Sequence, residues 1–178
     1  MENKAKALKA IAEEIIESKR CPLARLALGK PVPGEGPPNA KIFFVGQAPG
    51  KEESKTGKPF VGRAGKFLNQ TLERIGLSRK KIFITSPEKY FPPKNRLPTL
   101  KELAACKPWL LKQIEIVDPK IIVLLGNFAA KALKNEKILE NRIVLKTYHP
   151  AAAMRFPKIK KKFIKDFFKL KEILKKLN

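Results

Sequence analysis

The sequence contains few cysteines and acidic residues, one histidine and no long apolar run. Its two cysteines, Cys21 and Cys106, are too few for a disulfide scaffold or for a metal site made of cysteine alone. The longest apolar run, residues 121–126, is too short to cross a bilayer, and the amino-terminal segment is charged and amphipathic. We therefore expect no membrane partner, and a location in the cytoplasm or, in a compartmented cell, in an organelle or the nucleus.

Basic residues outnumber acidic ones by 39 to 16, which gives a formal net charge of +23. A globular protein this basic repels itself unless a polyanion is its usual partner. Nucleic acid is the first candidate for that partner, and an anionic membrane surface is the second. A lysine-rich composition of the kind found in heat-adapted proteins is an alternative source of the charge, and it is compatible with nucleic-acid binding.

The pattern of apolar segments predicts the fold class. The length of 178 residues and the hydrophobic content of 43% suit one well-packed core. Apolar segments that predict buried parallel strands lie at residues 41–46, 81–86, 120–126 and 142–147. Helical patterns alternate with them, at residues 4–19, 63–75, 100–117, 127–133 and 158–177. We predict a single domain over residues 1–178, a three-layer α/β/α sandwich with a four-stranded, mainly parallel sheet.

Local signals predict where some of these elements begin. Thr99 and Glu102 form a capping-box pattern that opens the helix running to about Val117. Asn127 is a candidate cap for the short helix that follows the third strand. The proline- and glycine-rich residues 31–38 predict a loop.

Unusual residues follow three of the predicted strands, in residues 46–50, 85–87 and 148–150. Ligands in such folds bind beyond the carboxyl ends of the strands, so we expect a site there. The turn GQAPG could direct backbone amides at a ligand oxygen, although a purely structural turn explains the same pattern. It is not a P-loop, because three residues separate Gly46 from Gly50 and Glu52 follows Lys51.

Two ring-bearing side chains are candidates for this site. Phe60 lies in a glycine-rich segment, where it could stack on a base or simply fill the core. His149 directly follows the fourth strand and precedes a proline that constrains the turn. Most lone histidines have no special role, but this position at the sheet end favours a function.

Polar and basic segments are also expected at or near the carboxyl ends of the strands. Asn95 and Arg96, and residues 154–156, are predicted to lie on loops, where they contact phosphate or stay solvated. The carboxyl-terminal helix carries nine lysines between residues 158 and 176. Its apolar stripe is expected to cover the sheet, and its lysines to be solvated, to reach DNA phosphate or to lie on a membrane surface.

Together, these segments resemble the family-4 uracil-DNA glycosylases, the thermophilic iron–sulfur type, from about Cys21 to the end of the chain. The resemblance rests on GQAPG with Glu53, GKPFVGRAG, KYFPPKNRLP with Cys106 downstream, and YHPAA, in that order and spacing. It implies a monomeric, monofunctional DNA-repair enzyme that hydrolyses the N-glycosidic bond of uracil in DNA and leaves an abasic site. Neither strand preference nor contact with replication proteins follows from it.

The resemblance also implies roles for individual residues. A glycosylase must flip the nucleotide out of the stack before it attacks the bond between sugar and base. The implied catalytic residues are Gln47, Glu53 and His149, and the implied uracil-binding residues are Gly46, Ala48, Phe60 and Ser86. The implied DNA-contacting residues are Lys58, Arg63, Asn95, Arg96, Met154 and Arg155.

Three departures from the family pattern concern the pocket. Gln47 stands where the family usually has glutamate, and an amide can orient water but cannot accept its proton. Ser54 replaces an acidic residue, and Ser86 replaces the asparagine that usually reads uracil. Two alternative functions follow: a glycosylase of shifted specificity, for hypoxanthine or other deaminated bases, and a damage-binding protein with weak catalysis.

A fourth departure concerns the iron–sulfur cluster of the family, which needs four cysteines. Cys21 and Cys106 match two of its ligands, whereas Ala24 and Tyr90 occupy the other two positions. We therefore expect no cofactor and no metal. The two cysteines are expected to form either a disulfide, as in some hyperthermophile proteins, or a pair of inert buried thiols.

Overall fold

The computed structural model describes residues 2–177, so the first and last residues of the predicted domain lie outside it. Its centre is a four-stranded sheet in the order β2-β1-β3-β4, in which every neighbouring pair is parallel. The strands are β1 (Ile42–Val45), β2 (Ile82–Thr85), β3 (Ile121–Leu125) and β4 (Ile143–Thr147). The predicted α/β/α fold with a four-stranded sheet is confirmed, and each strand ends within one residue of its predicted bounds.

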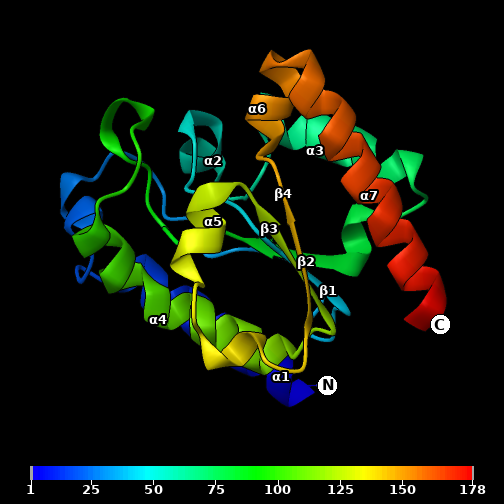
Figure 1. Cartoon of the computed structure of the whole chain (residues 1–178). Helices are drawn as coiled ribbons and strands as arrows, with labels where there is room; N and C mark the ends of the chain where they lie inside the picture. Colours follow the sequence, from blue (N-terminus) through cyan, green and yellow to red (C-terminus); the bar gives the residue numbers. More distant parts are fainter. Residues whose placement is uncertain (1, 178) are drawn as a thin grey trace.

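Helices cover both faces of the sheet (Figure 1). One face packs against α3 (Arg63–Arg74), α6 (Pro150–Arg155) and α7 (Pro157–Leu177). The other face packs against α4 (Leu100–Val117) and α5 (Asn127–Ala132), and α1 (Glu2–Glu17) lies along α4. All residues of β1, β2 and β3 are buried, because alternate side chains enter the two layers. The edge strand β4 is partly exposed, so the expectation of two apolar faces was wrong for this strand.

The shorter elements correct some predictions. The helix α2 (Lys51–Thr56) follows the GQAPG turn, and residues 154 and 155 belong to α6 rather than to a loop. Short 3-10 helices are η1 (Pro22–Leu26), η2 (Arg79–Lys81), η3 (Pro93–Asn95) and η4 (Lys137–Leu139). Gly126, not Asn127, caps α5; its φ of 92° favours glycine, and Asn127 is the first helical residue. The predicted capping box of α4 forms in full, with Thr99 and Glu102 bonded to each other's backbone amides.

A buried hydrogen-bond network holds the loop of residues 31–38 against the sheet. The carbonyl oxygen of Pro33 accepts hydrogen bonds from Lys89 Nζ, Thr85 Oγ1 and Gln113 Nε2. Lys89 is fully buried, and burial lowers its pKa to about 7. This loop lines one side of the strand ends, so the network fixes part of the wall of the site. Within residues 2–177, no helix is long and apolar enough to span a bilayer.

Candidate active site

A pocket of about 500 Å³ lies at the carboxyl ends of β1, β2 and β4. Parallel strands end at one edge of the sheet, so residues far apart in sequence meet there. Of the sequence-predicted residues, the pocket is lined by Gln47, Ala48, Glu53, Phe60, Arg63, Ser86, Asn95 and His149. Lys58, Arg96, Met154 and Arg155 are not part of its lining.

Phe60 forms a wall of this pocket while also joining the core below it. Its ring centroid lies 6.0 Å from that of His149, at an interplanar angle of 33°. Gly46 makes room for the ring, because a Cβ there would lie 2.6 Å from Phe60 Cζ. Gly65 does the same for the backbone, where a Cβ would lie 1.8 Å from the Phe60 carbonyl oxygen. Phe60 therefore packs in the core and also lines the pocket, while its stacking on a base stays a prediction.

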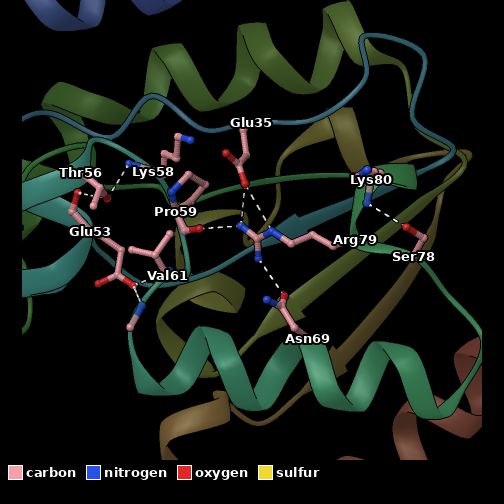
Figure 2. Close-up of polar contacts among 11 residues, drawn as sticks. Glu35, Glu53, Thr56, Lys58, Pro59, Val61, Asn69, Ser78, Arg79 and Lys80 are labelled. Atoms are coloured by element: carbon pink, nitrogen blue, oxygen red, sulfur yellow. Dashed lines mark hydrogen bonds and ion pairs between the residues drawn. The ribbon is translucent and has the colours of Figure 1, made fainter.

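Glu53 joins α2 to the loop that carries Phe60 (Figure 2). One carboxylate oxygen accepts from the amides of Val61 and Gly62, at 2.9 and 2.8 Å. The other accepts from the amide of Gly50 at 3.1 Å. Since backbone amides bond to both oxygens, the carboxylate holds this wall of the pocket in place.

Arg79 contacts the same loop and lies between Glu35 and Asn69, as Figure 2 shows. Its guanidinium donates to the carbonyl oxygen of Pro59 at 2.5 Å, to Glu35 Oε1 at 2.8 Å and to Asn69 Oδ1 at 3.1 Å. The sequence analysis missed this residue, because a lone arginine before a strand carries no local signal of its partners. Its effect is to fix the backbone immediately before Phe60.

His149 caps the amino terminus of α6. Its Nδ1 accepts a hydrogen bond from the amide of Ala151 at 3.3 Å, which assigns the ring proton to Nε2. Burial lowers the pKa of His149 to about 4, although the charge of Glu53 acts in the opposite direction. The imidazole is therefore neutral at physiological pH and presents one N–H donor.

Two polar side chains of the pocket are available to a ligand. Among residues 2–177, no protein group forms a hydrogen bond with the side chain of Gln47 or Ser86. Ser86 is nevertheless buried, with 7% of its surface exposed. Gln47 and His149 also line a neighbouring hollow of about 600 Å³, together with the exposed Leu97 and Leu100. The pocket thus continues into an apolar surface on the side of α4 and α5.

The remaining predicted DNA contacts lie outside the pocket. Arg96 donates to both carboxylate oxygens of Glu102, at 2.6 and 2.8 Å, so its guanidinium is already paired. Met154 and Arg155 are exposed on α6, where the guanidinium of Arg155 lies 5.6 Å from the ring centroid of Phe156. The exposed Lys51, which directly follows the GQAPG turn, lines the pocket wall.

The two cysteines are free thiols buried side by side. The structure shows no bond between them, so of the two alternatives only the unbridged thiols correspond to the geometry at Cys21 and Cys106. Both sulfur atoms lie against Glu88 Oε1, at 3.5 Å for Cys21 and 3.0 Å for Cys106. The hydroxyl of Tyr90 donates to the carbonyl oxygen of Ile15 at 2.6 Å. Two thiols and a phenol directed elsewhere do not fit a cluster that needs four thiolates.

The chain resembles proteins of known function over most of its length. The profile described as the uracil DNA glycosylase superfamily matches residues 33–171. Type-4 uracil-DNA glycosylases of Sulfurisphaera tokodaii and Saccharolobus solfataricus are each 42% identical, over 93% and 94% of this chain and 84% and 86% of their own. The type-4 uracil-DNA glycosylase of Thermotoga maritima is 38% identical over 95% of both chains.

Proposed function

Because the chain belongs to the uracil-DNA glycosylase superfamily, and within it to the type-4 enzymes, we propose that it excises uracil from DNA. It is a hydrolase of the N-glycosidic bond, and its product is an abasic site that enters base-excision repair. The observation that connects this function with individual residues is that Phe60 and a neutral His149 lie close together in one pocket.

Base recognition begins with a flipped nucleotide. The uracil ring enters the pocket and stacks on Phe60, whose position Glu53 and Arg79 hold through the backbone on either side. Ser86 offers its hydroxyl to the edge of the base. A hydroxyl makes one contact where an amide makes two, so Ser86 favours a broader range of deaminated bases.

Bond cleavage transfers an electron pair from the C1′–N1 bond to the leaving base. His149 Nε2–H donates to the uracil carbonyl oxygen, where the negative charge accumulates. A fixed donor in a pocket that excludes water stabilises this charge more in the transition state than in the ground state. A neutral imidazole suffices, since the group donates a hydrogen bond and keeps its proton.

Water completes the reaction at the anomeric carbon. The side-chain amide of Gln47 orients this water, whose oxygen bonds to C1′, and its proton leaves to solvent or to the departing base. Gln47 accepts a hydrogen bond from water but does not take its proton. Stabilisation of the departing base therefore lowers the reaction barrier more than activation of the attacking water does.

Contact with DNA follows from the surface around the pocket. The net charge of +23 favours the phosphate backbone. Met154, Arg155 and Phe156 form an exposed group on and just after α6, directly beyond His149. We assign this group to the gap that the flipped nucleotide leaves, since apolar side chains and arginine commonly occupy such gaps. The enzyme acts as a monomer on uracil-containing DNA.

The test is release of free base under single-turnover conditions. Oligonucleotides that contain uracil or hypoxanthine are compared, single-stranded and double-stranded, for the wild type and Ser86→Asn. We expect uracil release by both proteins and a narrower range of bases for the variant. Tight binding to uracil-containing DNA without release of base would instead favour the damage-binding function.

The same reaction tests the hydrolytic mechanism. Borohydride traps the Schiff base of a lysine that attacks the sugar, and Lys51 is the lysine that lines the pocket. We expect no trapped adduct and no strand cleavage. An adduct that disappears in Lys51→Gln would contradict monofunctional hydrolysis.

A further inference from the structure

Three side chains of metal-binding type meet beneath the amino-terminal helix. The sulfur atoms of Cys21 and Cys106 and a carboxylate oxygen of Glu88 all lie within 4.8 Å of one another. Each of the three residues has an exposed fraction of 0%. They come from three separate parts of the chain: the start of η1, the loop after β2 and the middle of α4.

The two carboxylate oxygens of Glu88 differ in their hydrogen bonds. Its Oε1 accepts from the backbone amides of Lys89 and Tyr90, at 2.9 and 3.1 Å, and both thiols also lie against this atom. Its Oε2 is buried and has no hydrogen-bond partner among the described residues. A buried carboxylate oxygen without a partner is costly, and it calls for a ligand.

We propose that Cys21, Glu88 and Cys106 bind one zinc ion as a structural site. Two sulfur atoms and two carboxylate oxygens make four donor atoms, the number that zinc takes in closed sites. At ordinary zinc bond lengths, sulfur and oxygen donors lie roughly 3.5 Å apart. Oε1 lies 3.0 and 3.5 Å from the two sulfur atoms, close to this spacing, and the unpartnered Oε2 is the second oxygen donor.

The surroundings match the charge and orientation that such a site requires. The two backbone amides on Oε1 fix the direction of the carboxylate, as outer partners of metal ligands do. Zinc binding releases the two thiol protons to solvent, which leaves the ion and its three anionic ligands with a net charge of −1. The fully buried Lys89 interacts electrostatically with Cys106 and Glu88 and offsets this charge.

This site differs in composition from the iron–sulfur cluster that the resemblance associates with the region. Glu88, rather than two further cysteines, completes the donor set, and Tyr90 packs in the same buried cluster. A single ion would still tie η1 and α4 to the end of β2. The inference is independent of base excision, because its measurements concern bound metal.

The experiment uses the full chain, freed of metal and mixed with Zn²⁺ or Co²⁺ alone. We expect one ion per chain and, with Co²⁺, near-ultraviolet absorption from thiolate-to-metal charge transfer. At a hundredfold excess over Kd, Zn²⁺ should raise Tm by roughly 5–10 °C. Zn²⁺ should also protect both thiols from alkylation, and a mercurial reagent should release the bound ion.

Variants locate the ion. Glu88→Gln and Cys106→Ser should each weaken zinc binding at least tenfold, since each removes an anionic ligand. Glu102→Gln is the matched control, because it neutralises another buried carboxylate on the helix that carries Cys106 and should leave the stoichiometry at one. If a variant does not fold, alkylation of the wild-type thiols with and without Zn²⁺ still decides the question. Absence of binding, unprotected thiols, or bound iron with inorganic sulfide would overturn the proposal.

Discussion

The neutral state of His149 is set by burial, and the chemistry of the pocket depends on it. A charged imidazole would carry a desolvation cost in this position, which is why its pKa is about 4 rather than near 6.5. The donor on Nε2 is therefore present across the physiological range. Its removal is the most direct test of the mechanism.

We predict that His149→Ala lowers the single-turnover rate of uracil release by about 100- to 1000-fold, the usual cost of losing one donor to a developing anion. Affinity for uracil-containing DNA should change little, because the base still stacks on Phe60. Single-turnover kinetics and equilibrium binding measure the two effects separately. A variant that retains the wild-type rate would remove His149 from the reaction.

The lowered pKa of His149 also predicts how stability depends on pH. The unfolded state binds a proton near pH 6.5 and the folded state only near pH 4, so folding is favoured above this window and weakened as pH falls through it. The contribution amounts to at most roughly 3 kcal/mol. Denaturant unfolding at pH 7.5 and 4.5 should therefore show a larger loss of stability for the wild type than for His149→Gln. Equal losses in both proteins would show that the imidazole titrates normally.

At the scale of single elements, the start of α4 depends on Arg96, which the family resemblance implied to be a DNA-contacting residue. Arg96 binds both oxygens of Glu102, a carboxylate that is 6% exposed and also completes the capping box. This hydrogen bond is the main reason that the pKa of Glu102 falls to about 2. The pair therefore stabilises the first turn of α4, beside the apolar hollow that adjoins the pocket.

We predict that Arg96→Ala lowers the free energy of unfolding by about 1–2 kcal/mol, because it leaves a buried carboxylate without its partner. The effect is moderate since the arginine is 40% exposed. Lys94→Ala, at a neighbouring exposed position, is the control and should be neutral. Loss of DNA affinity at unchanged stability would assign Arg96 to DNA after all.

At the scale of the whole molecule, only part of the basic charge is expected to lie close enough to contact bound DNA. The helix α7 begins beside α6, next to the pocket, and runs away from it to the carboxyl terminus (Figure 1). Its apolar stripe of Phe163, Phe167 and Leu170 packs on the sheet, which leaves most of its lysines exposed along the other side. Only the lysines near its start are expected to lie within reach of bound DNA.

We predict that Lys158→Gln with Lys161→Gln flattens the dependence of log affinity on log salt by about one to two, since each phosphate contact contributes roughly 0.9. Lys169→Gln with Lys176→Gln removes the same charge from farther along α7 and should leave the slope nearly unchanged. Binding is measured over a range of salt concentrations. Equal effects of the two pairs would indicate a response to net charge alone.

Much of the fold was predictable because its signals are local. The strands β1, β2 and β3 are short apolar runs buried on both sides, and Thr99 with Glu102 specifies the start of α4 within four residues. The helices α2 and α6 were missed because six residues show little periodicity; α5 has the same length, but a cap signal after the third strand predicted it. Caps stabilise them instead, through Glu53 in α2 and His149 in α6.

The sequence by itself determined the α/β/α class, the strand ends that carry the pocket and the motifs shared with the type-4 enzymes. Tertiary structure alone decided which polar groups satisfy one another: Glu53 with Val61 and Gly62, Arg79 with Pro59, and Glu88 with two thiols 67 and 18 residues away. Secondary structure follows from neighbours along the chain. A buried charge is stabilised by whatever group the packing brings within about 3 Å, and sequence order does not encode that proximity.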